Sequence, residues 1–278
     1  MSVLRIAFPK TNNLIKSYQT VALFEKNMIK EIFKRALFYL SVPKCVFCEE
    51  PLDYTDKCFC KSCRAKYEEW KREIDCSRCA NILSRCSCSK RILMKNNVNQ
   101  VFKLYKYRAF QEDIPGKRII YSLKEDYRSD VFDFLAEELA EAIDYNLKID
   151  KNKLIITNVP RRQKAISQFG YDHAAELAKR VAKILGVRYV SILKSKAKKP
   201  QKGRTDRRKN AKFVLKHGDW SFLKGHTVLI VDDIITSGSS VLAASEIVKN
   251  LGVRKRMAAC IAISYKDYYQ IPFKRELI

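Results

Sequence analysis

Glycine is scarce in this sequence, with only eight among 278 residues. Neither G-x-x-x-x-G-K-[ST] nor G-x-G-x-x-G occurs, which excludes the two common glycine-rich nucleotide-binding loops. Long apolar runs are missing as well, so we expect no membrane span. The first residues, MSVLRIAFPKTNNLIKSY, lack the continuous apolar stretch and the small-residue cleavage site of an export signal. We therefore expect a cytoplasmic protein.

Histidine is equally rare, with three residues in the chain. His173 begins an expected helix, whereas His217 and His226 lie in polar stretches beside glycines. These positions suggest no histidine-based catalytic site, and we expect all three to be structural or surface residues. No catalytic residue is assigned from the sequence.

Acidic residues are outnumbered, with 30 Asp and Glu against 55 Lys and Arg, for a net charge of +25. Such a balance favours a polyanionic partner, either a nucleic acid or a phosphate-rich ligand. The alternative is a lysine-rich surface that does no more than keep the protein solvated. Charge alone does not separate the two.

Cysteine is abundant, and nine of the ten cysteines lie between residues 45 and 88. In a cytoplasmic chain they favour metal binding over disulfides. Two Cys-x-x-Cys pairs separated by eleven residues are followed by a Cys-x-x-Cys and a Cys-x-Cys separated by six. Two such pairs supply the four thiolates of a structural zinc site, so we predict two zinc ions. The expected ligands are Cys45, Cys48, Cys60, Cys63, Cys76, Cys79, Cys86 and Cys88.

Two cysteines remain outside this scheme. Cys58 could replace Cys60 in a different register, and Cys260, in the run MAACIAIS, is expected to be an inert core thiol. A redox role for the Cys-x-x-Cys pairs is the weaker alternative to zinc, because redox pairs rarely occur in series.

The rest of the chain alternates between strand-like and helix-like segments, which indicates an α/β fold with a mostly parallel sheet covered on both faces. We expect a leader region (1–43) with an amphipathic helix at 21–42, a double zinc-ribbon domain (44–92) and an α/β domain (98–270). Expected strands are 101–107, 153–159, 188–193, 226–232 and 256–264. Expected helices are 130–147, 172–185 and 239–251, the second of them capped by Asp172 and followed by Gly186.

The stretch VLIVDDIITSGSS (228–240) carries the main functional signal. Val228 to Val231 read as a buried strand, with Asp232 and Asp233 at its C-terminal end, the edge where α/β sheets bind ligands. The hydroxyl residues that follow lead into a helix start, which suits a phosphate group. Because consecutive side chains of a strand diverge, we expect the two acids to have different tasks. A capped helix without a ligand is the alternative.

This stretch resembles the phosphoribosyl-pyrophosphate signature of type I phosphoribosyltransferases. The cysteine pairs ahead of it, the segments YSLKEDYR (121–128) and VPRRQKAISQFGYDHAAELA (159–178), and a basic loop with Gln201 resemble the ComF family (ComF/GntX-type) over roughly residues 35–265. The chain departs from many relatives at Phe169, where they have an arginine. The resemblance implies a type I phosphoribosyltransferase fold, Mg²⁺ bound with phosphoribosyl pyrophosphate (PRPP), and a link to natural competence.

The resemblance also implies roles for individual residues. Asp232 and Asp233 would contact the ribose hydroxyls, and the 5′-phosphate would be held by Thr236, Ser237, Gly238, Ser239 and Ser240. The pyrophosphate side would be served by Arg161, Arg162 and Lys164. The segment 194–216, with eleven basic residues and one acid, would be a mobile basic loop carrying Gln201, Thr205, Arg207, Arg208 and Asn210.

Two kinds of function follow. The first is binding or transfer of a phosphoribosyl group from PRPP or a similar ribose 5-phosphate ligand, with enzymatic turnover left open and a role in competence. The second is a single-stranded DNA-binding or scaffold protein of the transformation machinery, partnered by a competence helicase, whose phosphoribosyl site is not catalytic. The two are compatible with each other.

Overall fold

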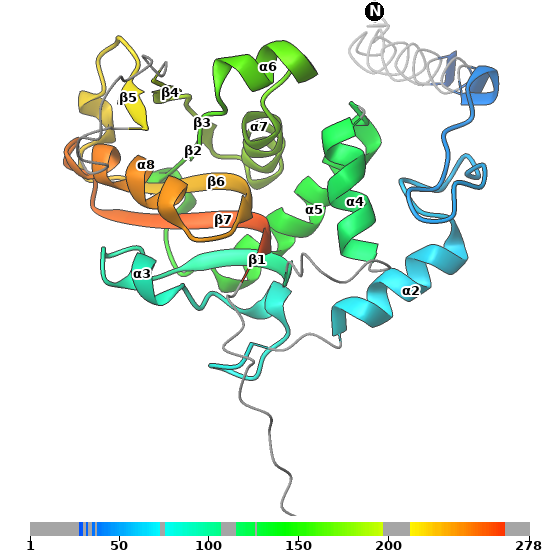
Figure 1. Cartoon of the computed structure of the whole chain (residues 1–278), viewed down its shortest axis with the longest axis horizontal. Coiled ribbons are helices and arrows are strands. Elements are labelled where there is room, and N and C mark those ends of the chain that lie inside the picture. The colour runs from blue at the N-terminus through cyan, green and yellow to red at the C-terminus, as the bar shows by residue number, and fades with distance from the viewer. Residues whose placement is uncertain are drawn as a thin grey trace, which may run out of the picture.

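The computed structural model describes residues 38–72, 76–106, 115–125, 127–196 and 212–264, together with single positions at 28, 29, 32, 35 and 36 (Figure 1). The helices are α2 (Lys61–Arg72), α3 (Arg91–Met94), α4 (Pro115–Glu125), α5 (Ser129–Asn146), α6 (Gln163–Phe169), α7 (His173–Leu185) and α8 (Ser239–Lys249). The strands are β1 (Val101–Lys106), β2 (Leu154–Asn158), β3 (Arg188–Tyr189), β4 (Leu193–Ser195), β5 (Phe213–Leu215), β6 (Thr227–Ile235) and β7 (Lys255–Ile263). Three short 3₁₀ turns are η1 (Leu83–Arg85), η2 (Lys151–Lys153) and η3 (Ser221–Leu223).

Five strands form one parallel sheet in the order β1-β7-β6-β2-β3, and β4 and β5 form a separate antiparallel pair. The strands of the sheet are apolar because both faces are covered: β7 is buried at every position after Lys255. Apolar residues of α5 and α7 pack on one face, and those of α8 pack on the other (Figure 1). The predicted α/β architecture is confirmed.

Helix α7 begins and ends where the sequence predicts, because its signals are local. The Asp172 carboxylate accepts a hydrogen bond from the Ala175 backbone N–H at 3.1 Å, which caps the first turn. Gly186 takes the left-handed conformation at the other end, with φ of 68°. Between them an apolar stripe that includes Leu177, Val181 and Leu185 is buried against the sheet.

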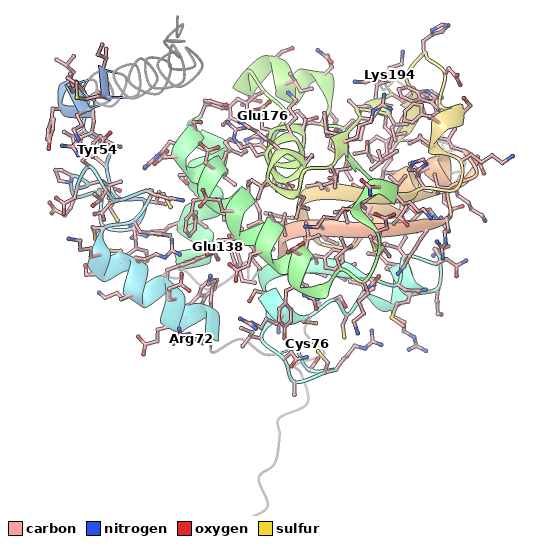
Figure 2. All side chains as sticks on the ribbon, turned by 180° about the vertical axis from the view of Figure 1, so that it is seen from behind. Tyr54, Arg72, Cys76, Glu138, Glu176 and Lys194 are labelled. Carbon is pink, nitrogen blue, oxygen red and sulfur yellow. The ribbon has the colours of Figure 1, made fainter. Side chains whose placement is uncertain are left out.

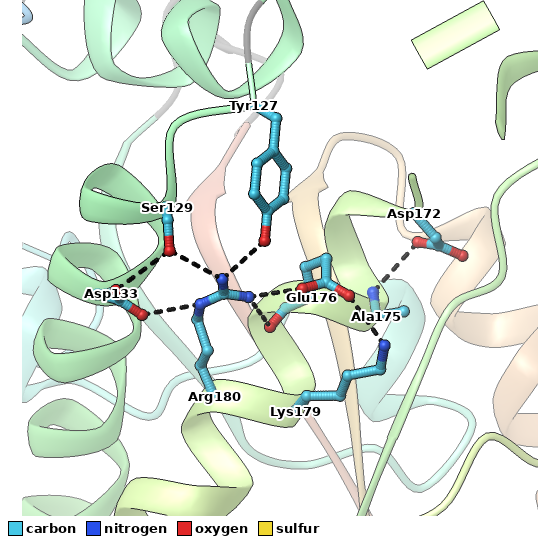
Figure 3. A network of polar contacts seen from close by, with 8 residues as sticks. All are labelled: Tyr127, Ser129, Asp133, Asp172, Ala175, Glu176, Lys179 and Arg180. Carbon is cyan, nitrogen blue, oxygen red and sulfur yellow. Dashed lines mark hydrogen bonds and ion pairs between the residues drawn. The ribbon is translucent and has the colours of Figure 1, made fainter. Parts of the chain in front are cut away.

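A charged network fixes α7 against α5. The Arg180 guanidinium donates to Asp133 at 2.8 Å and to Glu176 at 2.7 Å, and it also contacts Ser129 and the Tyr127 hydroxyl (Figure 3). Burial would raise the pKa of Glu176, but the hydrogen bonds from Lys179 and Arg180 outweigh burial and lower it. This network holds the first turn of α7, and therefore Asp172, in a defined place beside the sheet.

Several sequence predictions need correction. The strand expected at 188–193 is two short pieces, with Arg188 and Tyr189 in the main sheet and Leu193 in the antiparallel pair. Strand β6 continues to Ile235, so the two acids lie inside a strand and not after it. Helices α2, α4 and α6 were not predicted, and most of the helix expected at 21–42 lies outside the described residues. Within the described part of the chain, no helix combines the length and apolarity needed to cross a membrane.

Candidate functional site

The direction in which successive strands of the chain are added to the sheet reverses between β2 and β6. The chain leaves β2 for β3 on one side through α7, and it leaves β6 for β7 on the other side through α8. The two strands are paired, with Asn158 opposite Val231, and the Val159 N–H donates to the Val231 carbonyl at 2.8 Å. The segments that follow β2 and end β6 therefore diverge from one point, which is where open α/β sheets bind ligands.

Asp232 and Asp233 stand beside this point on β6, both half-buried. Asp232 accepts the backbone N–H of Asp233 at 3.0 Å, and Asp233 accepts that of Ile234 at 2.7 Å. Burial, and then the charge of Asp233 and a side-chain hydrogen bond with it, raise the pKa of Asp232 well above its ordinary value. The carboxyl groups of Asp232 and Asp233, called here the carboxyl pair, thus influence each other, and their separate tasks stay a prediction.

The segment Thr236–Ser240, called here the hydroxyl loop, connects β6 to α8. Gly238 has φ of 84° and precedes the first residue of α8, a conformation that favours glycine. The Ser237 hydroxyl donates to the Ser239 hydroxyl at 3.1 Å and accepts the Ser239 N–H at 3.3 Å. Lys212 adds a positive charge, because its ammonium donates to the Ser239 hydroxyl at 2.8 Å. Hydroxyls, helix N–H groups and a cation thus gather at one turn, which suits a phosphate.

The loop after β2 brings Arg161 to the same edge. Its backbone N–H donates to the Asp172 carboxylate at 2.9 Å, and its guanidinium contacts the His173 ring. Arg162 is exposed at the start of α6, and Lys164 lies in α6, its side chain outside the described residues. Of the three basic residues predicted for the pyrophosphate side, Arg161 is the one that the structure ties to the edge of the sheet.

His173 is a neighbour of the site that the sequence did not reveal. It is buried, so of the two expected kinds of position, structural or surface, it takes the first. Burial and the Arg161 charge lower its pKa, while Asp233 acts in the opposite direction, so the ring stays neutral beside the guanidinium. The available signal was its position directly after the Asp172 cap, at the strand edge that binds ligands.

Asn158 is a further residue at this edge of the sheet. It is buried at the end of β2, its amide nitrogen donates to the Asp172 carboxylate at 3.4 Å, and its amide oxygen accepts the Tyr189 hydroxyl at 2.8 Å. The amide therefore connects the ends of β2 and β3 to the start of α7.

The basic segment is described only at its two ends. Lys196 donates through its backbone N–H to the Lys212 carbonyl at 3.0 Å, so β4 and β5 bring both ends together next to the hydroxyl loop. The predicted loop residues Gln201, Thr205, Arg207, Arg208 and Asn210 lie outside the described residues.

The eight predicted zinc ligands form two groups, as their spacing predicts. The first cysteine group is Cys45, Cys48, Cys60 and Cys63, and the second is Cys76, Cys79, Cys86 and Cys88. Within each group all sulfurs lie within 4.8 Å of one another, close to the roughly 3.8 Å edge of a tetrahedral zinc–thiolate site. Each group can therefore hold one metal ion. Cys58 belongs to neither, because it is fully buried in the core, as is Cys260.

The charge within the cysteine groups also fits a metal. The Ser62 hydroxyl, chiefly, lowers the pKa of Cys60 to about 6. In the second group burial opposes ionisation of Cys76, but backbone N–H groups and neighbouring thiols outweigh it and lower its pKa to about 7. Each group therefore contains one thiol with a lowered pKa, whereas burial raises the pKa of Cys63 in the first group and of Cys86 in the second to about 12. A metal ion binds the thiolate form, which the lowered pKa favours.

A buried lysine faces the second cysteine group from β1. The Lys103 side chain is inaccessible to solvent, and its ammonium donates to the Cys86 sulfur at 3.1 Å, to the Cys86 and Cys88 carbonyls at 3.0 Å and to the Val101 carbonyl at 3.1 Å. A buried charge requires such compensation, and a metal-bound thiolate at Cys86 would add to it. This role could not be predicted from the sequence, because Lys103 lies within an apolar strand.

Comparisons with known proteins address the same part of the chain. Residues 172–271 match the family model described as phosphoribosyl transferase domain. The comparison with curated proteins gives no match.

Solved structures of three phosphoribosyltransferases are similar to this chain. A purine phosphoribosyltransferase from Pyrococcus horikoshii is 26% identical over 47% of this chain and 71% of its own, with a TM-score of 0.30. An adenine phosphoribosyltransferase from Thermoanaerobacter pseudethanolicus is 20% identical over 51% of this chain and 83% of its own, with a TM-score of 0.33. The adenine phosphoribosyltransferase from Saccharomyces cerevisiae is 23% identical over 50% of this chain and 70% of its own, with a TM-score of 0.30.

The matched residues contain the whole of α7, β6, the hydroxyl loop and α8. The family match and the parallel sheet with its reversal between β2 and β6 point to the same architecture. Residues 172–271 are thus similar in sequence to the phosphoribosyl transferase domain, and the α/β part of the chain that contains them is a parallel sheet flanked by helices.

Proposed function

We propose that this protein binds PRPP together with Mg²⁺ at the edge formed by β2, β6 and the hydroxyl loop, as a ComF-type protein acting in DNA uptake. The observation that carries the proposal is the place of the Asp232–Asp233 pair: it lies at the reversal point of the sheet, within the matched residues, and runs directly into the hydroxyl loop. The ComF assignment and the role in DNA uptake rest on the sequence resemblance.

The residues present suit the parts of this ligand. The hydroxyl loop offers hydroxyls, helix N–H groups and the Lys212 charge to a 5′-phosphate. Arg161 supplies a guanidinium on the opposite side, where a pyrophosphate would lie. The carboxyl pair can accept the ribose hydroxyls as hydrogen-bond donors.

The carboxyl pair also suits magnesium, which prefers oxygen ligands. Each carboxylate has one oxygen bonded to backbone N–H and a second oxygen to offer. Magnesium, when bound, would supply positive charge against the pyrophosphate. A cation or hydroxyl donors at the raised-pKa group Asp232 would favour its charged form and lower that pKa, so we expect ligand binding to release a proton.

Isothermal titration calorimetry of the full chain with PRPP and Mg²⁺ tests the proposal. We expect saturable binding to the wild type, weaker binding of ribose 5-phosphate, which lacks the pyrophosphate, and loss of binding in Asp232→Ala with Asp233→Ala. Titration in two buffers of different ionisation enthalpy would reveal the released proton. A wild type that binds neither ligand would refute the proposal.

The matched control is Asp144→Ala with Asp150→Ala. This variant also loses two negative charges, but both acids are exposed near η2, at the opposite end of the strands. It should bind PRPP as the wild type does. Equal loss in both double variants would mean that the carboxyl pair is not the site.

Single-stranded DNA binding is the second candidate, favoured by the net charge of +25 and by the anchoring of the basic segment beside the hydroxyl loop. Contacts with several phosphates would make the affinity fall steeply with salt. We expect fluorescence anisotropy with labelled oligothymidine to show this fall. An affinity that is unchanged between about 50 and 200 mM salt would contradict this candidate.

A further inference from the structure

The short segment that follows the second cysteine group reaches the hydroxyl loop. The Lys90 ammonium donates to the carbonyl of Thr236, the first residue of the loop, and to the carbonyl of Ser264, which directly follows β7. One side chain from the cysteine region thus joins the ends of two neighbouring strands at the candidate site.

The same segment also supports the middle of the loop. Leu93 in α3 is fully buried, and a Cβ atom added at Gly238 would lie 3.3 Å from its Cγ atom. The loop backbone therefore rests directly on α3. Because α3 has only four residues, it is too short to be stable by itself, and its position must come from its surroundings.

The second cysteine group supplies that position. Arg78, which lies between Cys76 and Cys79, donates to the Ser89 carbonyl at 2.9 Å, directly before Lys90. The buried Ser89 hydroxyl donates in turn to the Val98 carbonyl at 2.7 Å, which closes the segment that contains α3. A continuous path of contacts therefore runs from the metal-binding turn through Ser89 and Lys90 to the loop.

The second cysteine group has a small apolar core. Among the described residues, the cluster of buried apolar side chains around it consists of Leu83, Cys76 and Cys86, with Cys88 packed alongside. Lys103 adds hydrogen bonds from β1, but a single leucine contributes little apolar burial, so we expect the fold of this turn to depend largely on the bond between metal and thiolates.

The first cysteine group contacts a different part of the molecule. Lys57, Arg64 and Lys71 pair with Glu137 and Glu138 on α5. Figure 2 shows Glu138 on the side of the molecule that faces this group, whereas Cys76 lies apart, below the sheet. The two cysteine groups thus provide an internal comparison.

We propose that metal in the second cysteine group, and not in the first, holds the hydroxyl loop in its ligand-binding conformation through Lys90 and Leu93. Lys90 is a positioning residue, because it acts on the loop backbone. For the ligand the inference rests on the proposed function, but the order of the loop can be measured without any ligand.

The first test compares Cys79→Ser with Cys48→Ser in the full chain. Both cysteines are exposed ligands, one in each group, so the substitutions are alike. Each variant should lose about one zinc equivalent. Amide hydrogen exchange followed by mass spectrometry should then show faster deuterium uptake over residues 236–240 in Cys79→Ser and unchanged uptake in Cys48→Ser. Equal uptake in the two variants would overturn the proposal.

The second test leaves all zinc ligands in place and compares Lys90→Met with Lys57→Met, whose lysine joins the first group to α5. Loss of two hydrogen bonds from a charged donor should weaken PRPP binding roughly tenfold in Lys90→Met. Zinc content should stay at the wild-type value, Lys57→Met should bind normally, and Lys90→Arg should recover part of the affinity. Wild-type affinity and wild-type exchange over residues 236–240 in Lys90→Met would refute the inference.

The two proposals fail in different ways. If the wild type binds no PRPP, the proposed function fails, whereas the exchange of residues 236–240 still reports on the support by the second cysteine group. If the wild type binds PRPP and neither Cys79→Ser nor Lys90→Met changes binding or exchange, the support fails and the function stands.

Discussion

Replacing Lys103 by methionine would remove a buried positive charge while keeping a side chain of similar length. Its ammonium has four acceptors within hydrogen-bond distance for its three N–H groups, and one of them is the Cys86 sulfur at 3.1 Å. Four thiolates around one Zn²⁺ leave a net charge of about −2, and Lys103 offsets part of it. At 3.1 Å and an effective dielectric constant near 20, two unit charges attract by about 5 kcal/mol.

The desolvation of the ammonium reduces this gain, so the net cost of Lys103→Met is smaller than the Coulomb energy. Removing one partner of a buried, hydrogen-bonded charge pair costs about 3–5 kcal/mol, and we expect the free energy of unfolding of the zinc-loaded protein to fall by that amount. The lost stability should mainly affect the second cysteine group, because that is the cysteine group whose atoms Lys103 contacts.

Urea unfolding of the zinc-loaded protein measures this change, and release of zinc to a chromophoric chelator measures the metal. We expect Lys103→Met to lose one of two zinc equivalents at least tenfold faster than the wild type, while the other equivalent is released at the wild-type rate. Lys95→Met, at an exposed lysine next to α3, serves as the control and should change neither quantity. Unchanged stability together with unchanged zinc release in Lys103→Met would refute the electrostatic account.

Three further predictions concern the carboxyl pair, the hydroxyl loop and a buried tyrosine. Asp232 has a raised pKa, so between the unfolded and the folded pKa the folded state binds a proton more strongly than the unfolded state does. The contribution of Asp232 to the free energy of unfolding is complete below the unfolded pKa of about 4. It is lost by about 1.4 kcal/mol per pH unit as the pH rises toward the folded pKa. Urea unfolding between pH 4 and 8 should therefore show Asp232→Asn gaining stability relative to the wild type as the pH rises, and a constant difference would contradict this. Gly238→Ala should destabilise the protein by about 1–2 kcal/mol because of the positive φ at this position. The loss should exceed that in Gly186→Ala, because an added Cβ at Gly238 meets Leu93, whereas one at Gly186 meets nothing within 4 Å. Equal thermal shifts in the two variants would argue against the contact with Leu93. The Tyr67 hydroxyl is buried and has no hydrogen-bond partner among the described residues. Tyr67→Phe should therefore leave the free energy of unfolding unchanged or raise it by up to about 1 kcal/mol, and a clear loss in urea unfolding would show that the hydroxyl has a partner.

Features that depend on neighbouring residues could be predicted from the sequence. The Asp172 cap, the Gly186 end of α7 and the division of eight cysteines into two groups follow from chemistry that acts over a few residues. The strand that delivers two acids and a hydroxyl-rich helix start was also recognisable, because an apolar run, two acids and small residues follow one another directly in the sequence.

Features that depend on contacts between distant segments could not be predicted from the sequence. The separation of Arg188 from Leu193 into two sheets follows from which strands are available as partners, and the burial of His173 beside Arg161 follows from the packing of α7. The raised pKa of Asp232 is of the same kind, because it depends chiefly on desolvation by the surrounding fold.

The sequence by itself therefore determined the chemical parts of this protein: two sets of metal ligands, a parallel-sheet domain and an acidic strand leading to a hydroxyl loop. The tertiary structure decided how those parts meet. It placed β2 beside β6 to create the reversal point, and it brought Lys103 to the second cysteine group and Lys90 to the hydroxyl loop. Local spacing specifies ligands and caps, but the contacts between them arise only when distant segments bury their apolar faces together.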